Sequence, residues 1–360
     1  WGDALKQAIE FEQEIVKISQ VTGKSIDQLN GLTASVTKLA TGLGVASSDI
    51  IGVGRILSQA GFKARDLEVA LTALTKTELA PTFTDIRKTA EGVVAIFNQF
   101  GAGAEALEAQ LGAINKVAGQ FAVESDDLID AVRRAGGVFD SAGGSLNEFI
   151  ALFTSVRSTT RESAESIATG LRTIFTRIQR PKTLEFLRQY GVELLDLEGK
   201  FVGPFEAVNR LNKAFAGLDK GDITFVKVAE ELGGFRQIGK VIPLIQQFGK
   251  AQAALGVANQ GAGSLAADAL KAQLSLANSF IKTKEEFLSL VRTITSSDTF
   301  QSITKGALAL SRAFIQVVES LSPLIPLVTA LGAVKLGKAL PGIIGGVGEV
   351  LGGIQRRNQG

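Results

Sequence analysis

The side chains of this 360-residue chain that could do chemistry are carboxylates, lysines, arginines, hydroxyls and the single tyrosine, because the sequence contains no His, Cys or Met. Without imidazole and thiolate groups, the chain can build neither a Ser-His-Asp nor a Cys-His nucleophile. Zinc sites of the usual ligand sets and haem ligation by His, Cys or Met are excluded as well. Chemistry that uses carboxylates, Lys, Arg, Tyr190 or hydroxyl groups remains possible.

Three pairs of adjacent carboxylates could in principle transfer protons: Asp126-Asp127, Glu230-Glu231 and Glu285-Glu286. Each pair lies at the start or on the face of a predicted helix. Capping and complementation of the helix dipole account for the first and third pairs. Because no other residue indicates a pocket beside them, we expect no catalytic residue at these positions.

Two short motifs come close to nucleotide-binding or catalytic patterns. Residues 332–339 are one residue short of a phosphate-binding loop, because Ala339 stands where a Ser or Thr would hold the magnesium ion. Ser-x-x-Lys occurs at residues 35–38 and 302–305 without the companion motifs of the enzymes that use it. The sequence therefore predicts no enzyme, no cofactor and no bound metal.

Residues 157–188 include seven basic and three acidic residues, although the net charge of the whole chain is only +2. One interpretation is contact with DNA or with an acidic protein wall. The other is a solvated face with ion pairs inside the chain. The arginines concerned are Arg157, Arg161, Arg172, Arg177 and Arg180. No aromatic stacking pattern accompanies them, and we expect no sequence-specific binding of nucleic acid.

The most apolar part of the chain lies near its C-terminal end. Residues 320–334 and 339–348 carry no charge and are separated by Lys335 and Lys338. Neither half reaches the roughly 18 apolar residues of a membrane-spanning helix. We consider both insertion into a membrane after a trigger and burial inside an oligomer or against the rest of a longer protein. The candidate residues are Leu324, Ile325, Leu327, Val328, Gly342, Ile343, Ile344 and Gly346.

The elements that would position these groups are helices. Apolar residues recur every three or four positions, as in Ile26, Leu29, Leu32, Val36 and Leu39, which is the period of an amphipathic helix. Gly or Pro interrupts the pattern about every 15 to 25 residues. We predict an all-α fold, namely an array or bundle of short-to-medium amphipathic helices with short connections.

Two segments depart from this pattern. Residues 192–202 are short, apolar and divided by a turn-like Glu-Gly-Lys, which predicts a small β-hairpin or an extended loop. Residues 265–294 carry a long, little-interrupted apolar pattern, which predicts one long helix. The chain then divides into an N-terminal helical part (1–100), a central helical part with the hairpin (101–250), a long-helix segment (251–320) and an apolar, Gly-rich C-terminal segment (321–360).

Residues 40–67 and 118–146 share one order of features: a cap, a helix, an Ala-Gly turn, a second cap and a second helix. Matching the two segments requires a four-residue insertion. Duplication and chance convergence of helix-capping residues both account for the similarity.

Several motifs in fixed order give the chain a family resemblance. Residues 58–62 read Ser-Gln-Ala-Gly-Phe at the end of a predicted helix, and residues 169–172 read Thr-Gly-Leu-Arg within the stretch 163–175. Tyr190-Gly191-Val192 then precedes an Asp-Leu-Glu-Gly-Lys-Phe turn at residues 196–201. In this order, over residues 21–215, the chain resembles the core region of phage tail tape measure proteins.

The resemblance implies a structural protein of the virion that lies inside the tail tube. Proteins of this kind set tail length during viral tail assembly and are expelled to assist genome ejection. It further implies a small homo-oligomer such as a trimer, assembled in the host cytoplasm. Its partners would be the tail tube protein, tail hub or baseplate proteins, tail assembly chaperones and, after ejection, the host membrane.

The length of the chain and its interruptions limit what the resemblance implies. As one continuous helix, 360 residues would span about 540 Å, but the Gly and Pro interruptions predict a compact helical part instead. Because the chain begins without Met, we expect an internal piece of a longer protein whose ruler lies mostly elsewhere. The alternative function is a membrane-active translocation or pore-forming protein, with residues 321–351 as the inserting hairpin. A third possible function is that of a helical interaction module without a viral role.

Overall fold

The computed structural model describes residues 2–101, 103–215, 217–219 and 221–295. Their regular secondary structure is helical throughout, with sixteen α-helices and three short 3-10 turns, which confirms the all-α prediction. In chain order the α-helices are α1 (Gly2–Thr22), α2 (Asn30–Leu43), α3 (Ser47–Gln59), α4 (Ala64–Thr77), α5 (Ile86–Gln99), α6 (Leu107–Gln120), α7 (Ser125–Ser141), α8 (Leu146–Thr160), α9 (Ala164–Arg177), α10 (Pro181–Arg188), α11 (Pro204–Phe215), α12 (Ile223–Gly233), α13 (Ile238–Gln246), α14 (Phe248–Asn259), α15 (Ser264–Gln273) and α16 (Leu276–Thr295).

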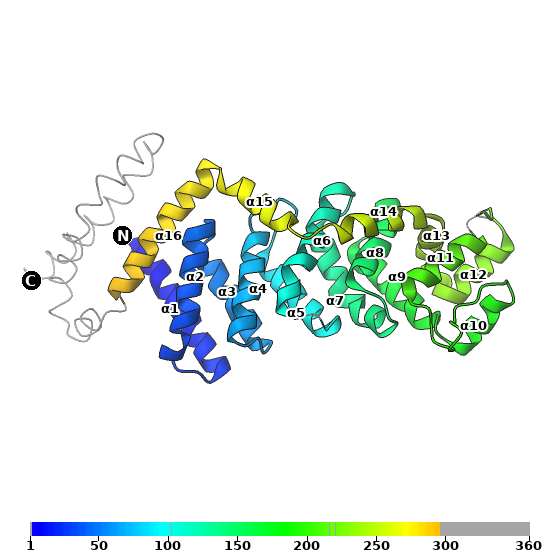
Figure 1. The fold of residues 1–360 in the computed structure, drawn as a ribbon, viewed down its shortest axis with the longest axis horizontal. Coiled ribbons are helices and arrows are strands. Elements are labelled where there is room, and N and C mark those ends of the chain that lie inside the picture. Colours follow the sequence, from blue (N-terminus) through cyan, green and yellow to red (C-terminus); the bar gives the residue numbers. More distant parts are fainter. Residues whose placement is uncertain (1, 102, 216, 220, 296–360) are drawn as a thin grey trace, which may run out of the picture.

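The helices are stacked in two rows along an elongated molecule (Figure 1). Each odd-numbered helix from α1 to α9 packs on the next odd-numbered one, and α12 packs on α9 at the far end. The even-numbered helices from α2 to α8 form the second row in the same way. Because one helix pair cannot bury its apolar faces alone, stacking is what completes the core. That core extends without a break from Phe11 to Leu265. The predicted division of the chain into four segments (1–100, 101–250, 251–320 and 321–360) stays a prediction.

A regular sequence period underlies the first row. The helices α3, α5, α7 and α9 begin at residues 47, 86, 125 and 164, so successive starts are 39 residues apart. The fourth residue of each helix is completely buried: Ile50, Thr89, Leu128 and Ile167. Residues 40–67 and 118–146 therefore hold equivalent places in the array, two periods apart. The four-residue insertion is one extra turn of α7, which has 17 residues where α3 has 13.

Short polar side chains set several of the helix starts. The Asp85 carboxylate accepts hydrogen bonds from the backbone N–H groups of Arg87 and Lys88 at the start of α5. At α8, the Ser145 hydroxyl accepts from the Glu148 N–H, while the Glu148 carboxylate accepts from the Ser145 N–H. These bonds satisfy backbone donors that have no partner inside the helix, and they fix where each helix begins.

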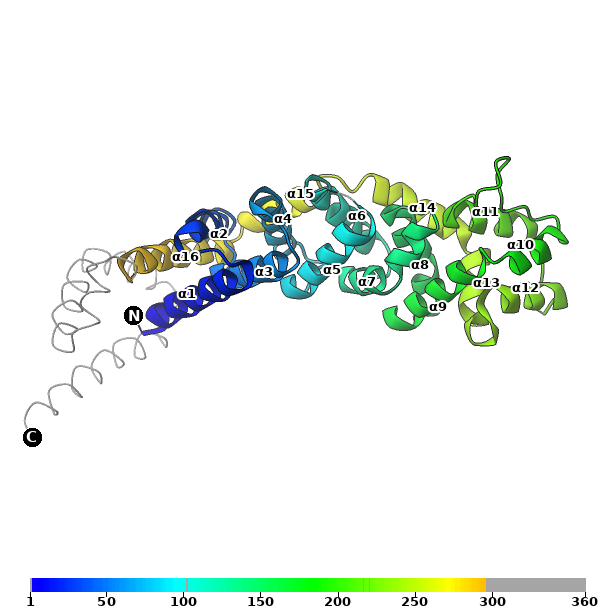
Figure 2. The same cartoon turned by 90° about the horizontal axis from the view of Figure 1, so that it is seen from below.

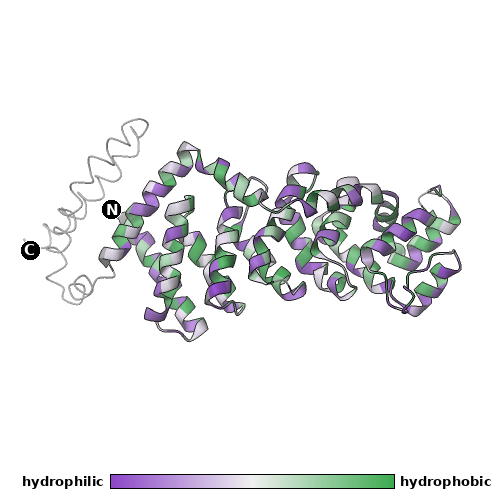
Figure 3. Ribbon diagram, viewed as in Figure 1, coloured by the Kyte–Doolittle hydropathy of each residue, from purple (hydrophilic) through white to green (hydrophobic). Residues whose placement is uncertain are grey.

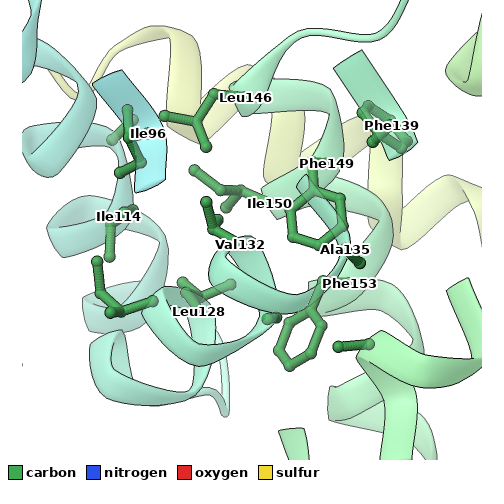
Figure 4. Packing of buried hydrophobic residues seen from close by; sticks show 14 of the residues in the cluster. Ile96, Ile114, Leu128, Val132, Ala135, Phe139, Leu146, Phe149, Ile150 and Phe153 are labelled. Atoms are coloured by element: carbon green, nitrogen blue, oxygen red, sulfur yellow. The ribbon is translucent and has the colours of Figure 1, made fainter. Parts of the chain in front are cut away.

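Apolar and polar residues alternate along each helix (Figure 3), and most of the buried side chains are apolar. The largest of them meet where α7, α8 and α9 pack together. The Phe139 ring packs edge-on against Phe149 and Phe175, with ring centroids 5.3 and 5.0 Å apart. Ile150 and Val132 fill the neighbouring space (Figure 4). Phenylalanine thus serves as plain packing between helices.

Beyond α12 the chain turns back and runs the length of the array again (Figures 1 and 2). On this path α14 packs on α8 and α6, α15 on α6 and α4, and α16 on α2 and α1. We call α14, α15 and α16 the return layer. It covers the second row, so that row lies between two layers of helices. The predicted periodicities did not reveal the return layer, because the contacts that define it join residues far apart in sequence.

The return layer crosses α6 at a backbone-to-backbone contact. The turn after α14 brings Gly261 against Gly112 and Ala113, and a Cβ atom on either glycine would collide with the backbone of the other segment. Beside this contact, the buried Asn115 amide donates to Ser264 Oγ and, over 2.8 Å, to Asp268 Oδ2. The crossing therefore combines close glycine packing with satisfied polar groups.

The β-hairpin prediction for residues 192–202 is wrong, since no strand forms among the described residues. The loop contains a single antiparallel bridge between Leu195 and Phe201. Within it, the Asp196 carboxylate accepts from the backbone N–H groups of Glu198 and Lys200 and holds a tight turn. Two paired residues with no third strand beside them do not make a sheet. The apolar Leu194 is buried in the helical core instead.

The predicted long helix of residues 265–294 is interrupted at Leu274 and Ser275, which separate α15 from α16. No Gly or Pro occurs between residues 264 and 295, so the usual causes of a break are absent. A local cap by Ser275 and a tertiary contact of Asn278 set the break instead. Asn278 Nδ2 donates to the carbonyls of Leu43 and Gly44 at the end of α2, while Ser275 Oγ accepts from the Asn278 N–H.

Candidate functional site

Three of the five candidate arginines make contacts between helices. Arg157 Nε lies 2.9 Å from Asp127 Oδ2, which joins α8 to α7. Arg161 Nη1 donates to the carbonyl of Ala122 from a left-handed backbone position (φ 59°) at the end of α8. Arg177 Nε donates to the carbonyl of Glu231, so its charge lies at the C-terminal end of α12, where the helix dipole favours a cation.

The other two, Arg172 on α9 and Arg180 before α10, are exposed. Within the described residues neither guanidinium has an ion-pair partner. Pairing inside the chain thus accounts for part of the basic segment, while these two side chains are the ones positioned to meet an acidic surface. Contact of the five arginines with DNA or a tube wall stays a prediction.

Replacing arginines with glutamine distinguishes those that stabilise the fold from those available to an acidic partner. Arg172→Gln with Arg180→Gln is expected to change the free energy of unfolding by less than about 0.5 kcal/mol, because exposed positions tolerate substitution. The salt concentration that elutes the protein from heparin should fall. Arg157→Gln should cost about 1–2 kcal/mol, since Asp127 loses a charged hydrogen-bond donor. Urea unfolding and heparin chromatography test both; equal stability losses in the two variants would contradict this division.

Glu162, at the α8–α9 turn, forms a further ion pair that links the rows to α13. Lys240 Nζ lies 2.8 Å from Glu162 Oε2, and Ser166 Oγ donates to the same carboxylate. Partial burial works to raise the pKa of this carboxyl, but the bonds from Lys240 and Ser166 outweigh it and leave the pKa below its usual 4.5.

This lowered pKa predicts an acid-sensitive contribution to stability. A carboxyl whose pKa is lowered by folding stabilises the protein above its unfolded-state pKa and stops doing so as the pH falls through the folded-state value. Glu162→Gln should therefore cost about 1 kcal/mol or less at pH 7, and this difference from the unsubstituted chain should shrink as the pH falls below the usual value. Urea unfolding at pH 7 and pH 3 measures it; a constant difference would contradict the assignment.

Each of the three carboxylate pairs includes a side chain that is bonded or buried inside the fold. Asp127 pairs with Arg157, and Asp126 accepts a short hydrogen bond from Thr84 Oγ1. Glu231 Oε1 accepts from Thr183 Oγ1 over 2.8 Å. Glu285 is buried between α16 and the array. No group of three or more acidic side chains that could hold a metal ion occurs in the part of the chain described by the structure.

A polar seam beneath α16 was not identified from the sequence. Asn278, Glu285 and Arg292 succeed one another at seven-residue intervals on the face of α16 that meets α1, α2 and α3. Arg292 Nη1 donates to Ser47 Oγ, and its guanidinium lies 4.6 Å from the centre of the Phe11 ring. Burial lowers the pKa of Arg292, although Glu285 opposes that effect. The seven-residue spacing was the available signal.

The candidate apolar segment, Leu324 to Gly346, lies outside the described residues, so its two interpretations stay predictions. None of the helices within residues 2–295 combines the length and the apolar character that crossing a membrane requires.

Residues 33–234 match the family described as phage-related minor tail protein. The match covers more than half of the chain. The chain belongs to this family. It is therefore a component of a phage tail, which confirms the resemblance at the level of the tail. No solved structure matches the chain.

In this minor tail protein the matched region begins within α2 and ends just after α12. It therefore contains nearly all of the two helix rows. The return layer lies beyond it, at residues 248–295. The family match thus identifies the rows as the family-typical part, to which the return layer adds a further set of contacts.

Proposed function

We propose that this minor tail protein is the compact helical part of a tail tape measure protein. In this proposal it lies inside the tail tube as a small homo-oligomer, contacts the tail tube protein and the hub or baseplate, and is expelled ahead of the genome. Tail length is set by the protein to which this part belongs. The role is structural rather than enzymatic.

The observation that carries the proposal is the agreement between the family match and the ordered motifs. The Ala-Gly-Phe turn (residues 60–62), the Thr-Gly-Leu-Arg helix (169–172) and the Gly-Val-x-x-x-Asp turn (191–196) all fall within residues 33–234. In the structure these motifs lie at the end of α3, within α9 and in the loop after α10. The elongated shape of the array suits a tube interior (Figure 2).

Protease protection in intact virions tests the location. Phage particles that carry the natural protein should protect it from added protease, and protection should disappear once ejection is triggered. The purified protein serves as the reference for unprotected cleavage. Cleavage in intact tails at the rate of the purified protein would overturn the proposed location inside the tube.

Site-specific cross-linking tests the partner. A photoreactive amino acid in place of Arg180, an exposed position, should form a covalent adduct with the tail tube protein in assembled tails. The same amino acid in place of Phe149 is the matched control, because this fully buried side chain can reach only its own chain. An Arg180 adduct with baseplate proteins alone would overturn the contact with the tube wall.

The membrane-active alternative depends on residues 321–351, which lie outside the described part of the chain. Leakage of dye-filled liposomes by the full chain, lost on deletion of residues 323–354, would support it. Absence of leakage between pH 5 and pH 8 would leave the tail-tube role as the sole proposal.

A further inference from the structure

We propose that α15 and α16 are the two halves of one continuous helix, held apart while α16 is docked on α1 and α2. When α16 is released, the helix straightens and pairs with the same helix of a second copy of this chain. This inference concerns the purified protein and does not rest on a location inside the tail tube.

The first support is that the break is held in part from outside the helix, by Asn278, in addition to the local cap that Ser275 Oγ provides. Residues 264–295 contain neither Gly nor Pro, and Leu274, the residue that follows α15, still has right-handed helical backbone angles. The bonds from Asn278 Nδ2 to the carbonyls of Leu43 (2.7 Å) and Gly44 (3.2 Å) position the start of α16. Without them, the local sequence favours a helix of 32 residues, about 48 Å long.

The second support is that the buried apolar residues of α16 lie outside the main core. The apolar contacts of α16, Leu288 and Val291 against Ala4 and Ala8, form a small cluster separate from the main core. By contrast, Ala251 and Ala258 of α14 and Leu265 of α15 belong to the main core. Local opening starts where few apolar contacts hold a segment, so α16 should detach while α15 stays on α4 and α6.

The third support is the polar seam. Glu285 is almost completely buried, and its Oε2 atom accepts no hydrogen bond from the described residues. Arg292 Nη1 lies 4.0 Å from that atom, on the same helix. Because the two charges travel together, release of α16 returns both to water without separating them. Desolvation of such a pair offsets much of what docking gains.

The fourth support is the apolar face that a straight helix would carry. In one continuous helix, Leu270, Leu274, Ala277, Ile281, Leu288 and Val291 fall on one side, with Lys284 as the single charged position between them. Their spacing of three and four residues is that of a coiled-coil seam. In the broken form, Leu270 and Leu274 are 64% and 82% exposed, while Leu288 and Val291 are buried against α1.

The same spacing indicates the partner. Asn278, Glu285 and Arg292 each follow an apolar seam position of the straight helix by four residues, at the flanking position where coiled coils carry polar side chains. Asn278 and Arg292 make hydrogen bonds on the array, whereas the buried Glu285 Oε2 makes none there; at the edge of a paired helix all three would be hydrated. A second copy supplies the identical seam, so the occupant is the same helix of another chain.

Two opposing variants test the proposal. Asn278→Ala removes the bonds to α2 and should favour the straight form. Leu276→Pro places proline in the first turn of α16, which tolerates it, but in the interior of a continuous helix, which does not. The second variant should therefore lock the broken form. Asn147→Ala is the matched control, because its amide also bridges helices, to Asn259, far from the break.

Two quantities are measured: the distance between two spin labels and the molecular mass of the assembly. Because the chain has no cysteine, spin labels can be attached at Ala267→Cys and Glu286→Cys alone, and dilution of the labelled chain with unlabelled chain makes them report the α15–α16 separation within one copy. In a straight helix these positions lie about 28 Å apart, and the break shortens that separation. Asn278→Ala should populate the longer distance and produce a concentration-dependent dimer or trimer in sedimentation, whereas Leu276→Pro added to it should abolish both.

An Asn278→Ala protein that keeps the shorter distance of the unsubstituted chain would overturn the straightening. Lengthening without self-association at any concentration would overturn the second copy as the partner. Circular dichroism shows whether the variant has instead unfolded, in which case the labelled, unsubstituted chain titrated with urea should show the longer distance before the rows unfold. Loss of the rows first would contradict the proposal.

Discussion

Gly261→Ala is expected to separate the return layer from the second row and to lower the free energy of unfolding by about 3 kcal/mol, the upper end of the range for overpacking. The added Cβ meets backbone atoms of Gly112 and Ala113 rather than the end of a flexible side chain. The turn must then move away from α6, which also breaks the buried bonds of Asn115 to Ser264 and Asp268.

Urea unfolding measures the loss, and amide hydrogen exchange locates it in α14 and α15. Gly256→Ala is the matched control, because this residue lies in the interior of α14 with nothing near its Cβ position. It should stabilise the chain by about 0.5–1 kcal/mol, as alanine does inside a helix. If Gly261→Ala were as stable as Gly256→Ala, the close crossing of α6 would be incorrect.

Phe139→Ala is expected to cost about 3–5 kcal/mol, the usual loss for a fully buried phenylalanine. Phe139 contacts rings on both neighbouring helices of the array, Phe149 on α8 and Phe175 on α9. In an array, each helix pair is stabilised mainly by its neighbours. Weakening the middle should therefore divide the unfolding transition into two steps as well as shift its midpoint.

Thermal and urea unfolding, each followed by circular dichroism, would show both effects. Phe235→Ala provides the comparison, because this phenylalanine is 83% exposed and its loss should change stability by less than about 0.5 kcal/mol. A single sharp transition for Phe139→Ala, with a midpoint close to that of Phe235→Ala, would contradict a central role for this cluster.

Local features of the fold could be predicted from the sequence because they depend on neighbouring residues. Asp85 and Ser145 begin helices through hydrogen bonds that reach no farther than the next three residues, so their sequence surroundings are enough to indicate them. The 39-residue period is present in the sequence, but only the segments two periods apart share capping residues. The helices α3 and α7 both begin with a serine, Ser47 and Ser125, whereas α5 and α9 begin with Ile86 and Ala164.

Features that depend on distant residues could not be predicted. The α15–α16 break follows in part from Asn278 meeting the end of α2, more than 200 residues earlier, and the continuous apolar pattern gave no sign of it. The same limit applies to the arginines. The excess of positive charge was evident, but its division between Asp127, the Ala122 carbonyl and solvent depends on which helices pack together.

The return layer has a mechanical consequence. The first turns of α1 and the last turns of α16 touch through Ala4, Ala8, Leu288 and Val291. Stretched as one straight helix, residues 2–295 would extend about 440 Å, but in the folded array their two ends are separated by about one interhelical distance, roughly 10 Å. The folded array therefore adds mass to the protein but almost no distance between its two ends. A tension applied at its two ends would act first on α1 and α16, where the two helices touch, before any helix farther along the rows bears load.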